Sequence, residues 1–187
     1  MSQKTLRRKP RLNRRFRFQL LKNWIVGHYK KCRVADVGGG KGLLAYLLMM
    51  DGWTTAVIEP NKTKQLVKYK DFSLDKRVKL KLTDWSKLKI IEQEFDLELV
   101  DNFDLLVGLH AHGVNMRIID FCAQQKKDFV LLPCCVIDEP IEKQANVNWF
   151  DSLVEYAGDR GLKPKTSQLN FKGRNNLLYS DNYFAKK

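Results

Sequence analysis

The amino-acid sequence predicts an α/β fold, an open and mostly parallel sheet with helices on both faces. Short apolar segments of strand composition alternate with helical segments, which is typical of parallel sheets. A glycine-rich loop at residues 36–42 joins the first of these strands to a helix, as in nucleotide-binding α/β proteins. Two adjacent strand-like segments near the end of the chain predict a hairpin with an antiparallel edge strand.

The predicted elements follow one another in a regular order. We expect a basic arm over residues 1–12 and one domain over residues 13–187, because no linker or repeat divides the chain. Apolar residues at helical spacing predict a helix from 13 to 29, with Asn13 as its N-cap. The other expected helices are 43–50, 61–69, 115–126 and 147–159. The expected strands are 33–37, 53–59, 78–82, 103–109 and 129–132, followed by hairpin strands 165–171 and 176–180.

Positive charge is concentrated at the start of the sequence. Residues 1–35 contain twelve Lys and Arg and no Asp or Glu, which accounts for +12 of the formal net charge of +13. Such segments are typical of proteins that bind nucleic-acid phosphates, so RNA is the expected partner. The candidate RNA-binding residues of this region are Arg7, Arg8, Arg11, Arg14, Arg15 and Arg17. A solubilising tail and an organelle transit peptide are the alternatives.

The cysteines and the hydropathy of the sequence predict the cellular compartment, and whether the protein contacts a membrane or binds a metal. The four cysteines lack the spacing of a secreted disulfide framework, so we expect reduced thiols and a cytoplasmic protein. No apolar run approaches the roughly 18 residues that span a bilayer, so no membrane contact is expected. Two of the cysteines are adjacent, an arrangement that chelates one ion poorly and matches no zinc knuckle, so no metal is expected.

The glycine loop, Asp36-Val-Gly-Gly-Gly-Lys-Gly42, distinguishes between three kinds of nucleotide site. A P-loop would need Ser or Thr directly after its lysine, where this chain has Gly42. A dinucleotide fingerprint would need its third glycine at the position of Leu43. The remaining match, an acid followed by glycines at positions 38, 40 and 42, is the first motif of methyltransferases.

Acidic residues end the second and third expected strands. Glu59 could accept hydrogen bonds from two ribose hydroxyls, whereas Asp84 could accept from an adenine amino group beside a stacked Trp85 indole. Ligands of parallel sheets bind at the carboxyl ends of strands, so Asp36 would lie near the amino-acid end of the same ligand. Either acid alone could be a solvated turn residue, but two at successive strand ends favour a site.

With these residues the chain resembles the class I S-adenosylmethionine (SAM)-dependent methyltransferases, over roughly residues 13–182. The resemblance implies a Rossmann-like, seven-stranded sheet with SAM at the carboxyl ends of its strands. It also implies methyl transfer by in-line displacement at the sulfonium. The cofactor-binding residues that it implies are Asp36, Gly38, Gly39, Gly40, Gly42, Glu59, Asp84, Trp85 and Gly108.

Two further boxes follow the fourth and fifth expected strands. Residues 107–113 read Val-Gly-Leu-His-Ala-His-Gly, and residues 132–135 read Leu-Pro-Cys-Cys. Together they resemble a group of methyltransferase-like proteins with His-Ala-Cys-Gly and Pro-Cys-Cys boxes, whose relatives include tRNA ribose methyltransferases. This chain has His112 where that group usually has cysteine, and it lacks the histidines that follow the cysteines of the tRNA enzymes.

These boxes supply the candidate catalytic residues His110, Cys134 and Cys135. His110 could orient or deprotonate an acceptor, because the pKa of histidine lies near neutrality. A cysteine thiolate could attack a base, as in cytosine-5 RNA methylases, although this chain lacks their Pro-Cys near the fourth strand. The alternatives are a zinc site that includes His112 and, for the cysteines, simple burial at a strand end.

The remaining observations concern the acceptor. Lys172 and Arg174 in the final turn could contact RNA phosphates or could be ordinary solvated turn residues. The Asn/Asp-Pro-Pro-aromatic box of amino-group methylation is absent, which leaves a ribose or other oxygen acceptor open. Because no large insertion is present, we expect the arm and a partner protein to supply substrate binding. The leading hypothesis is a methyltransferase of tRNA or rRNA, and its rivals are a small-molecule or protein methyltransferase and a non-catalytic subunit.

Overall fold

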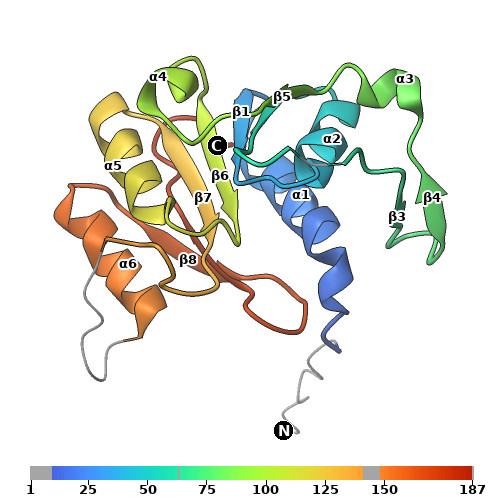
Figure 1. The fold of residues 1–187 in the computed structure, drawn as a ribbon. Helices are drawn as coiled ribbons and strands as arrows, with labels where there is room; N and C mark the ends of the chain where they lie inside the picture. The colour runs from blue at the N-terminus through green and yellow to red at the C-terminus, as the bar shows by residue number, and fades with distance from the viewer. Residues whose placement is uncertain (1–9, 63, 141–147, 187) are drawn as a thin grey trace, which may run out of the picture.

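A seven-stranded sheet forms the centre of the computed structural model, which describes residues 10–62, 64–140 and 148–186 (Figure 1). Its strands are β1 (Arg33–Val37), β2 (Thr54–Ile58), β5 (Lys89–Ile91), β6 (Leu105–Leu109), β7 (Asp128–Leu132), β8 (Lys165–Gln168) and β9 (Asn176–Tyr179). Their spatial order is β5-β2-β1-β6-β7-β9-β8. Every pairing is parallel except the two made by β9 in the closing hairpin. The predicted α/β fold with its mostly parallel sheet is therefore confirmed.

Helices cover both faces of this sheet (Figure 1). The helical elements are η1 (Arg14–Phe16), α1 (Arg17–His28), α2 (Leu43–Met50), α3 (Leu82–Trp85), α4 (Leu97–Val100), α5 (Asn115–Gln125) and α6 (Trp149–Asp159). Residues of α1 and α2 share an apolar cluster with Val34, whereas residues of α5 and α6 share another with its neighbour Ala35. Successive strand residues thus enter opposite layers, as expected for a sheet buried on both faces. No helix in the described part of the chain is both long and apolar enough to cross a membrane.

The helix predicted at residues 13–29 forms in two parts, η1 and α1. The side chain of Asn13 accepts a hydrogen bond from the Arg15 N–H at 3.0 Å and so caps η1. The chain just before η1 contacts the closing hairpin, because Leu12 bridges Phe171 and accepts from the Lys172 N–H at 2.9 Å. The base of the basic segment is therefore fixed beside the turn between β8 and β9 (Figure 1).

The segment between β2 and β5 differs from the expectation. The helix predicted at 61–69 is wrong, because the described residues of that stretch form no helix and its end enters β3 (Lys68–Lys70). The strand predicted at 78–82 forms in part as β4 (Arg77–Lys79), but its expected place in the main sheet is wrong, because β4 pairs only with β3 in a separate two-stranded sheet. Val78 is the only apolar residue of β4, between Arg77 and Lys79, so this strand has too little apolar surface to enter the core. The hairpin instead contacts η1, where Phe72 lies edge-on to Phe16 with ring centroids 5.7 Å apart.

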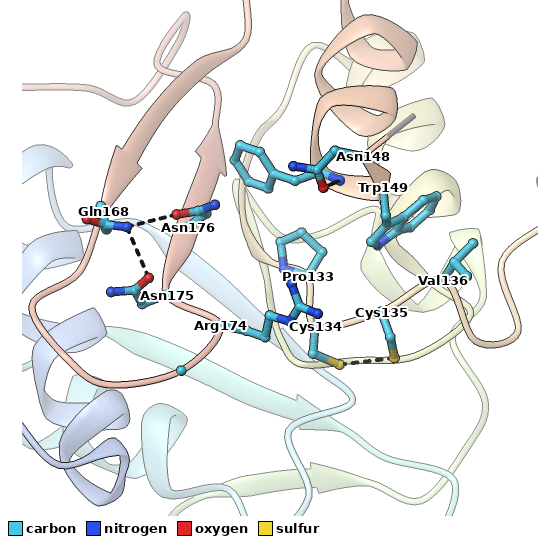
Figure 2. Close-up of a pocket in the computed structure, with 12 residues that line it drawn as sticks. Pro133, Cys134, Cys135, Val136, Asn148, Trp149, Gln168, Arg174, Asn175 and Asn176 are labelled. Atoms are coloured by element: carbon cyan, nitrogen blue, oxygen red, sulfur yellow. Dashed lines mark hydrogen bonds between the residues drawn. The ribbon is translucent and has the colours of Figure 1, made fainter. Parts of the chain in front are cut away.

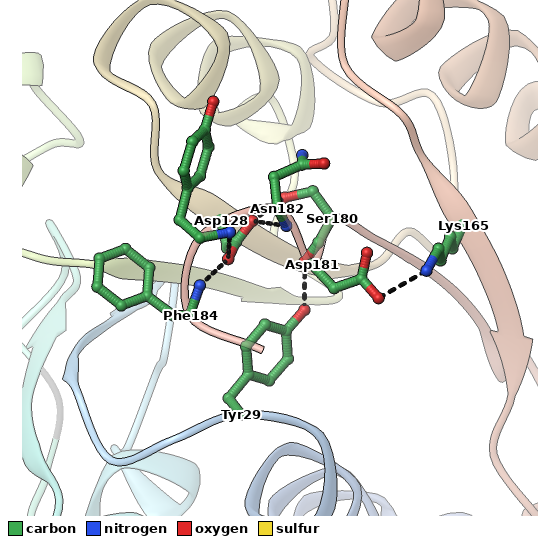
Figure 3. Close-up of polar contacts among 8 residues, drawn as sticks. Tyr29, Asp128, Lys165, Ser180, Asp181, Asn182 and Phe184 are labelled. Carbon is green, nitrogen blue, oxygen red and sulfur yellow. Dashed lines mark hydrogen bonds and ion pairs between the residues drawn. The ribbon is translucent and has the colours of Figure 1, made fainter. Parts of the chain in front are cut away.

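A buried carboxylate holds the last residues of the described chain at the amino end of β7 (Figure 3). Asp128 has no exposed surface and accepts a hydrogen bond from the Ser180 hydroxyl at 2.9 Å. It also accepts from the backbone N–H groups of residues 182–184 at 2.8–3.0 Å. The Tyr29 hydroxyl donates to the Ser180 carbonyl beside it. These bonds satisfy the carboxylate from within the protein.

Candidate active site

The loop between β1 and α2 has a backbone that requires glycine. Gly38, Gly40 and Gly42 have φ of 63°, 54° and 71°, a region that residues with side chains rarely adopt. A Cβ at Gly38 would lie 2.8 Å from the Cβ of Ala111, so this loop closely approaches the loop after β6. At Gly40, in contrast, a Cβ would have no other atom within 4 Å. The loop is thus packed at its start and borders open space at its tip.

Asp36 lies beneath this loop near the carboxyl end of β1. Only 1% of its surface is exposed, and its carboxylate accepts a hydrogen bond from the Ala45 N–H of α2 at 3.3 Å. A Cβ at Gly39 would lie 2.7 Å from that carboxylate, so only glycine fits there. Burial is the main cause that raises the pKa of Asp36 to about 7. A cation in the neighbouring cavity would favour the ionised form of this group.

Glu59 follows β2 at the same edge of the sheet and is 9% exposed. One carboxylate oxygen accepts from the Gly40 N–H at 3.0 Å. The other accepts from the backbone and side-chain N–H groups of Asn61, each at 3.1 Å. These bonds fix the carboxylate against the glycine loop, in a position to accept hydrogen bonds from ligand hydroxyls.

Two adjoining cavities open at the glycine loop. The larger, about 590 Å³, is lined by Glu59, by the residues that follow β5 and β6, and by Gly38. The smaller, about 400 Å³, lies against Asp36, residues 38–41 and the start of α1. Gly38 and His110 line both cavities, so a ligand that fills them would pass over the first glycine of the loop.

Arg17 lies in the wall of the smaller cavity rather than on the outside of the basic segment. Its guanidinium stacks on the Phe18 ring at 4.3 Å, and Nη1 donates to the Arg14 carbonyl at 3.4 Å. Its Nε is buried and has no hydrogen-bond partner among the residues that the structure describes. A half-buried guanidinium whose Nε lacks a partner, beside a cavity, favours an anionic ligand there. The sequence analysis assigned Arg17 to RNA, and the structure places it with the glycine loop.

The predicted positions of Asp84 and Trp85 are wrong, because they do not end the third strand. That strand is β5, whereas both residues belong to α3. The Trp85 indole is 7% exposed and packs against Tyr46 of α2 with ring centroids 5.6 Å apart. Asp84 pairs with Lys87 at 3.5 Å. The alternating residues 78–82 suggested a strand of the main sheet, and this shifted the expected strand end.

Glu94 and Phe95, which follow β5, line the larger cavity where Asp84 and Trp85 were expected. Phe95 is 4% exposed, and the Arg117 guanidinium lies over its ring at 5.1 Å and donates to its carbonyl at 2.6 Å. Neither residue could be identified from the sequence, because a strand of only three residues leaves almost no periodic pattern. The signal available was the pair of acids, Glu92 and Glu94, that follows Ile91.

His110 is held in a single orientation at the junction of the site. Its backbone is left-handed, with φ 57°, and its N–H donates to the Leu132 carbonyl at 3.1 Å. The ring Nε2 lies 3.1 Å from the Arg174 carbonyl, which can only accept, so Nε2 carries the proton. Burial is the main cause that lowers the pKa of His110, which favours the neutral ring. Its Nδ1 is then a hydrogen-bond acceptor and a potential base.

A third cavity, about 430 Å³, lies between the loop after β7, the start of α6 and the closing hairpin (Figure 2). Its wall includes Arg174, whose carbonyl binds His110, and the aromatic residues Trp149 and Phe150. The Trp149 Nε1 is buried without a hydrogen-bond partner among the described residues. On the hairpin side, Gln168 donates to Asn176 at 3.1 Å. The wall thus combines aromatic faces with amide groups.

The predicted cysteines also line this third cavity, and both are partly buried. Burial is the main cause that raises the pKa of Cys134, with a contribution from the neighbouring thiol, so the uncoordinated thiol is a poor nucleophile. The His112 Nε2 lies 3.0 Å from the Cys134 sulfur and 3.3 Å from the Cys135 sulfur. The structure therefore brings together the two boxes that the sequence analysis singled out.

The other predicted residues lie around these cavities. Gly108 is within β6, where a Cβ would be 2.9 Å from Leu131, so it permits packing between strands. A Cβ at Gly42 would likewise lie 2.9 Å from Val57. The exposed basic residues near the closing hairpin or in η1 are Arg11, Arg14, Arg15, Lys172 and Arg174. Arg7 and Arg8 lie outside the described residues.

Comparison with known proteins supports the fold. No protein-family model and no curated protein sequence matches this chain. Magnesium protoporphyrin IX methyltransferase (ChlM) from Synechocystis PCC 6803 with bound SAM has a TM-score of 0.53 at 12% identity, over 92% of this chain and 79% of ChlM. A fibrillarin/Nop5p complex gives 0.53 at 14% identity, over 89% of this chain and 82% of the other. The antibiotic-resistance methyltransferase Kmr gives 0.52 at 12%, over 86% and 91%. The chain has the Rossmann-like fold of class I SAM-dependent methyltransferases.

Proposed function

We propose that this protein is a SAM-dependent methyltransferase that acts on RNA. The observation that carries the proposal is the position of His110. It lines the two cavities at the glycine loop and binds the backbone of Arg174 in the wall of the third. A potential base therefore lies in the wall of a nucleotide-type site and is hydrogen-bonded to the wall of a separate cavity that could hold an acceptor.

The residues around the first two cavities fit SAM by charge and by shape. Arg17 and Asp36 line the smaller cavity and have charges opposite to the carboxylate and ammonium groups of the methionine part. Glu59 is fixed where it can accept from ribose hydroxyls, and Glu94 and Phe95 line the part of the cavity where the adenine would lie. The open space beside the Cα of Gly40 leaves room for the ligand. When bound, SAM supplies a methyl group on a positively charged sulfur.

His110 would act on the acceptor. Its protonated Nε2 is engaged by the Arg174 carbonyl, so Nδ1 is the atom that can take a proton from an acceptor hydroxyl. Its lowered pKa keeps this lone pair available at neutral pH. Arg17 contributes to that lowered pKa, so the same charge that would bind the SAM carboxylate also keeps His110 neutral.

The third cavity supports a nucleoside as the acceptor. Trp149 and Phe150 can stack on a base, and the buried Trp149 Nε1 is a donor without a protein partner among the described residues. Amide side chains on β8 and β9 can pair with base edges. The basic turn beside this cavity offers contacts to the adjoining phosphates.

A basic surface continues from this turn across the start of the chain. The bridge between Leu12 and Phe171 places Arg11 and η1 beside the hairpin. The β3–β4 hairpin, which contacts η1 through Phe72, adds a second set of exposed basic residues: Lys68, Lys76, Arg77, Lys79 and Lys81. The positive surface is therefore broader than the arm alone, and salt-sensitive RNA binding is expected.

Transfer of labelled methyl groups from SAM to total RNA tests the proposal. We expect methylated RNA with the full chain, and a loss of at least about 100-fold with His110→Ala. His28→Ala is the matched control, because His28 stacks on Trp24 at the far end of α1. Gly40→Asp should abolish SAM binding without unfolding, because Asp tolerates a left-handed backbone and its side chain would enter the cavity.

The same assay separates the rivals. Methylation of protein or small molecules but not of RNA would show that the acceptor is not RNA. Binding of SAM and RNA without any transfer would identify a non-catalytic subunit. If the protein binds SAM but shows no salt-dependent affinity for RNA, the RNA part of the proposal is wrong.

A further inference from the structure

The loops that follow β6 and β7 bring three potential metal ligands together. The two strands are parallel neighbours in register up to their last residues, Leu109 and Leu132. His112 is three residues beyond the first strand end, and Cys134 and Cys135 are two and three residues beyond the second. The alignment of the strands therefore delivers one imidazole and two thiols to one point at the ligand-binding edge of the sheet.

The donor atoms are already close to metal-binding distances. The two sulfurs are 3.4 Å apart, and the His112 Nε2 lies 3.0 Å and 3.3 Å from them (Figure 2 shows the two thiols). Tetrahedral zinc, with bonds of about 2.3 Å to sulfur and 2.0 Å to nitrogen, separates such ligands by roughly 3.5–3.8 Å. The three atoms would have to move apart by about half an ångström or less. In the sequence, the adjacent positions of Cys134 and Cys135 argue against a metal site. The structure adds a third donor, His112, from the neighbouring loop.

We propose that His112, Cys134 and Cys135 form a binding site for one zinc ion. Sulfur and imidazole nitrogen are the donors that Zn²⁺ prefers, whereas Mg²⁺ and Ca²⁺ require oxygen ligands. Each cysteine releases its thiol proton to solvent when zinc binds, and the two thiolates balance the charge of the ion, so binding adds no net charge to an already basic surface. His112 is exposed and both cysteines are partly buried, so the ion can enter from solvent without rearrangement of the core.

The number and position of the ligands define the character of the site. Among the described residues, no fourth His, Cys, Asp or Glu ligand atom joins the three within 4.8 Å. Three protein ligands leave a fourth coordination position for solvent or another ligand. The cysteines line the third cavity and His112 lines the larger cavity at the glycine loop, so the ion would lie on the wall between them.

Metal content of the isolated full chain tests this proposal without SAM, RNA or a measurement of activity. We expect about one equivalent of zinc per chain after reduction and incubation with Zn²⁺ alone. Co²⁺ in its place should show thiolate-to-metal charge-transfer absorption. Cys134→Ser, Cys135→Ser and His112→Ala should each reduce zinc affinity by at least about tenfold. His112→Cys should retain it, because cysteine is itself a zinc ligand.

Cys32→Ser is the matched control, since Cys32 is a partly buried thiol that precedes β1 at the opposite end of the sheet. Circular dichroism of each variant should show the wild-type fold, and His112→Ala provides the least disruptive change because His112 is exposed. The proposal is wrong if the reduced chain binds no zinc, or if the three variants bind it as well as Cys32→Ser does. Formation of a Cys134–Cys135 disulfide under the reducing conditions, in place of zinc binding, would also overturn it.

Discussion

Asp36 and Asp128 are both buried aspartates at strand ends, and they differ in how the protein satisfies them. Asp128, at the amino end of β7, receives one hydroxyl and three backbone N–H groups. Asp36, near the carboxyl end of β1, accepts one hydrogen bond at 3.3 Å within the described part of the chain. Burial raises the pKa of Asp36 to about 7. Among the described residues, the fold therefore satisfies the Asp128 carboxylate with four hydrogen bonds and the Asp36 carboxylate with one, which is consistent with the proposed SAM site.

Under the proposed function, this difference separates residues that stabilise the fold from residues that would bind SAM. Burial without enough hydrogen bonds costs free energy, so such a group is retained where a ligand repays the cost. Arg17 follows the same logic beside Asp36, because its buried Nε has no partner among the described residues. The two aspartates therefore make opposite predictions for stability and for ligand affinity.

Asp128→Asn has the largest expected effect. The amide keeps one acceptor oxygen but turns an N–H₂ group toward donors that now lack partners, which costs about 2–4 kcal/mol of the free energy of unfolding. Urea denaturation measures this loss. The affinity for SAM, measured by calorimetry on the folded protein, should stay unchanged. A loss of affinity with unchanged stability would break the comparison.

Asp36→Asn should have the opposite profile. Removal of the negative charge beside a cationic ligand should weaken SAM binding about tenfold or more. The folded-state pKa of Asp36 is raised, so its favourable contribution is present below about pH 4 and is lost as the pH rises through about 7. The variant should therefore be more stable than the wild type at pH 8, by about 1 kcal/mol or more, and not at pH 4. Equal stability at both pH values would show that Asp36 is not destabilised by its charge.

The wild-type protein makes a matching prediction for ligand binding. A cationic ligand lowers the pKa of Asp36, so the bound protein holds fewer protons than the free protein near neutrality. The affinity for SAM should fall as the pH decreases below about 7, by up to about tenfold per pH unit. Binding titrations with SAM at several pH values from roughly 5.5 to 8.5 measure this slope, because this range extends to both sides of the pKa of Asp36. Asp36→Asn should lose the slope, and a slope that persists would assign it to another group.

Most residues of the candidate site could be predicted from the sequence, because the carboxyl edge of the sheet is built from local motifs. The acid and glycines of residues 36–42, the acid after β2 and the boxes after β6 and β7 are all read from short spacings. The fold places them at one edge because parallel strands share their direction. The predicted positions of Asp84 and Trp85 are wrong because a three-residue strand gave no pattern to align them.

Other features depend on contacts between distant residues, and the sequence does not encode them locally. Asp128 meets groups more than 50 residues away, and nothing near it distinguishes it from a turn acid. The approach of His112 to the two cysteines depends on the register between β6 and β7. The place of Arg17 in a cavity wall depends on how α1 packs on the sheet, so the arginine-rich segment was interpreted as one uniform surface.

Arg17→Gln has the smallest of these expected effects and tests whether the contrast extends beyond carboxylates. The loss of one charge-assisted contact to the SAM carboxylate should weaken SAM binding by about five- to tenfold. Because the charge of Arg17 contributes to the lowered pKa of His110, the variant should also move the acidic limb of the methyl-transfer pH profile to higher pH. Arg14→Gln is the control, since Arg14 is exposed, and it should change RNA affinity and its salt dependence but not SAM affinity. If both variants weaken only RNA binding, Arg17 belongs to the outer basic surface, and the unpaired Nε would then be explained by RNA rather than by the cofactor.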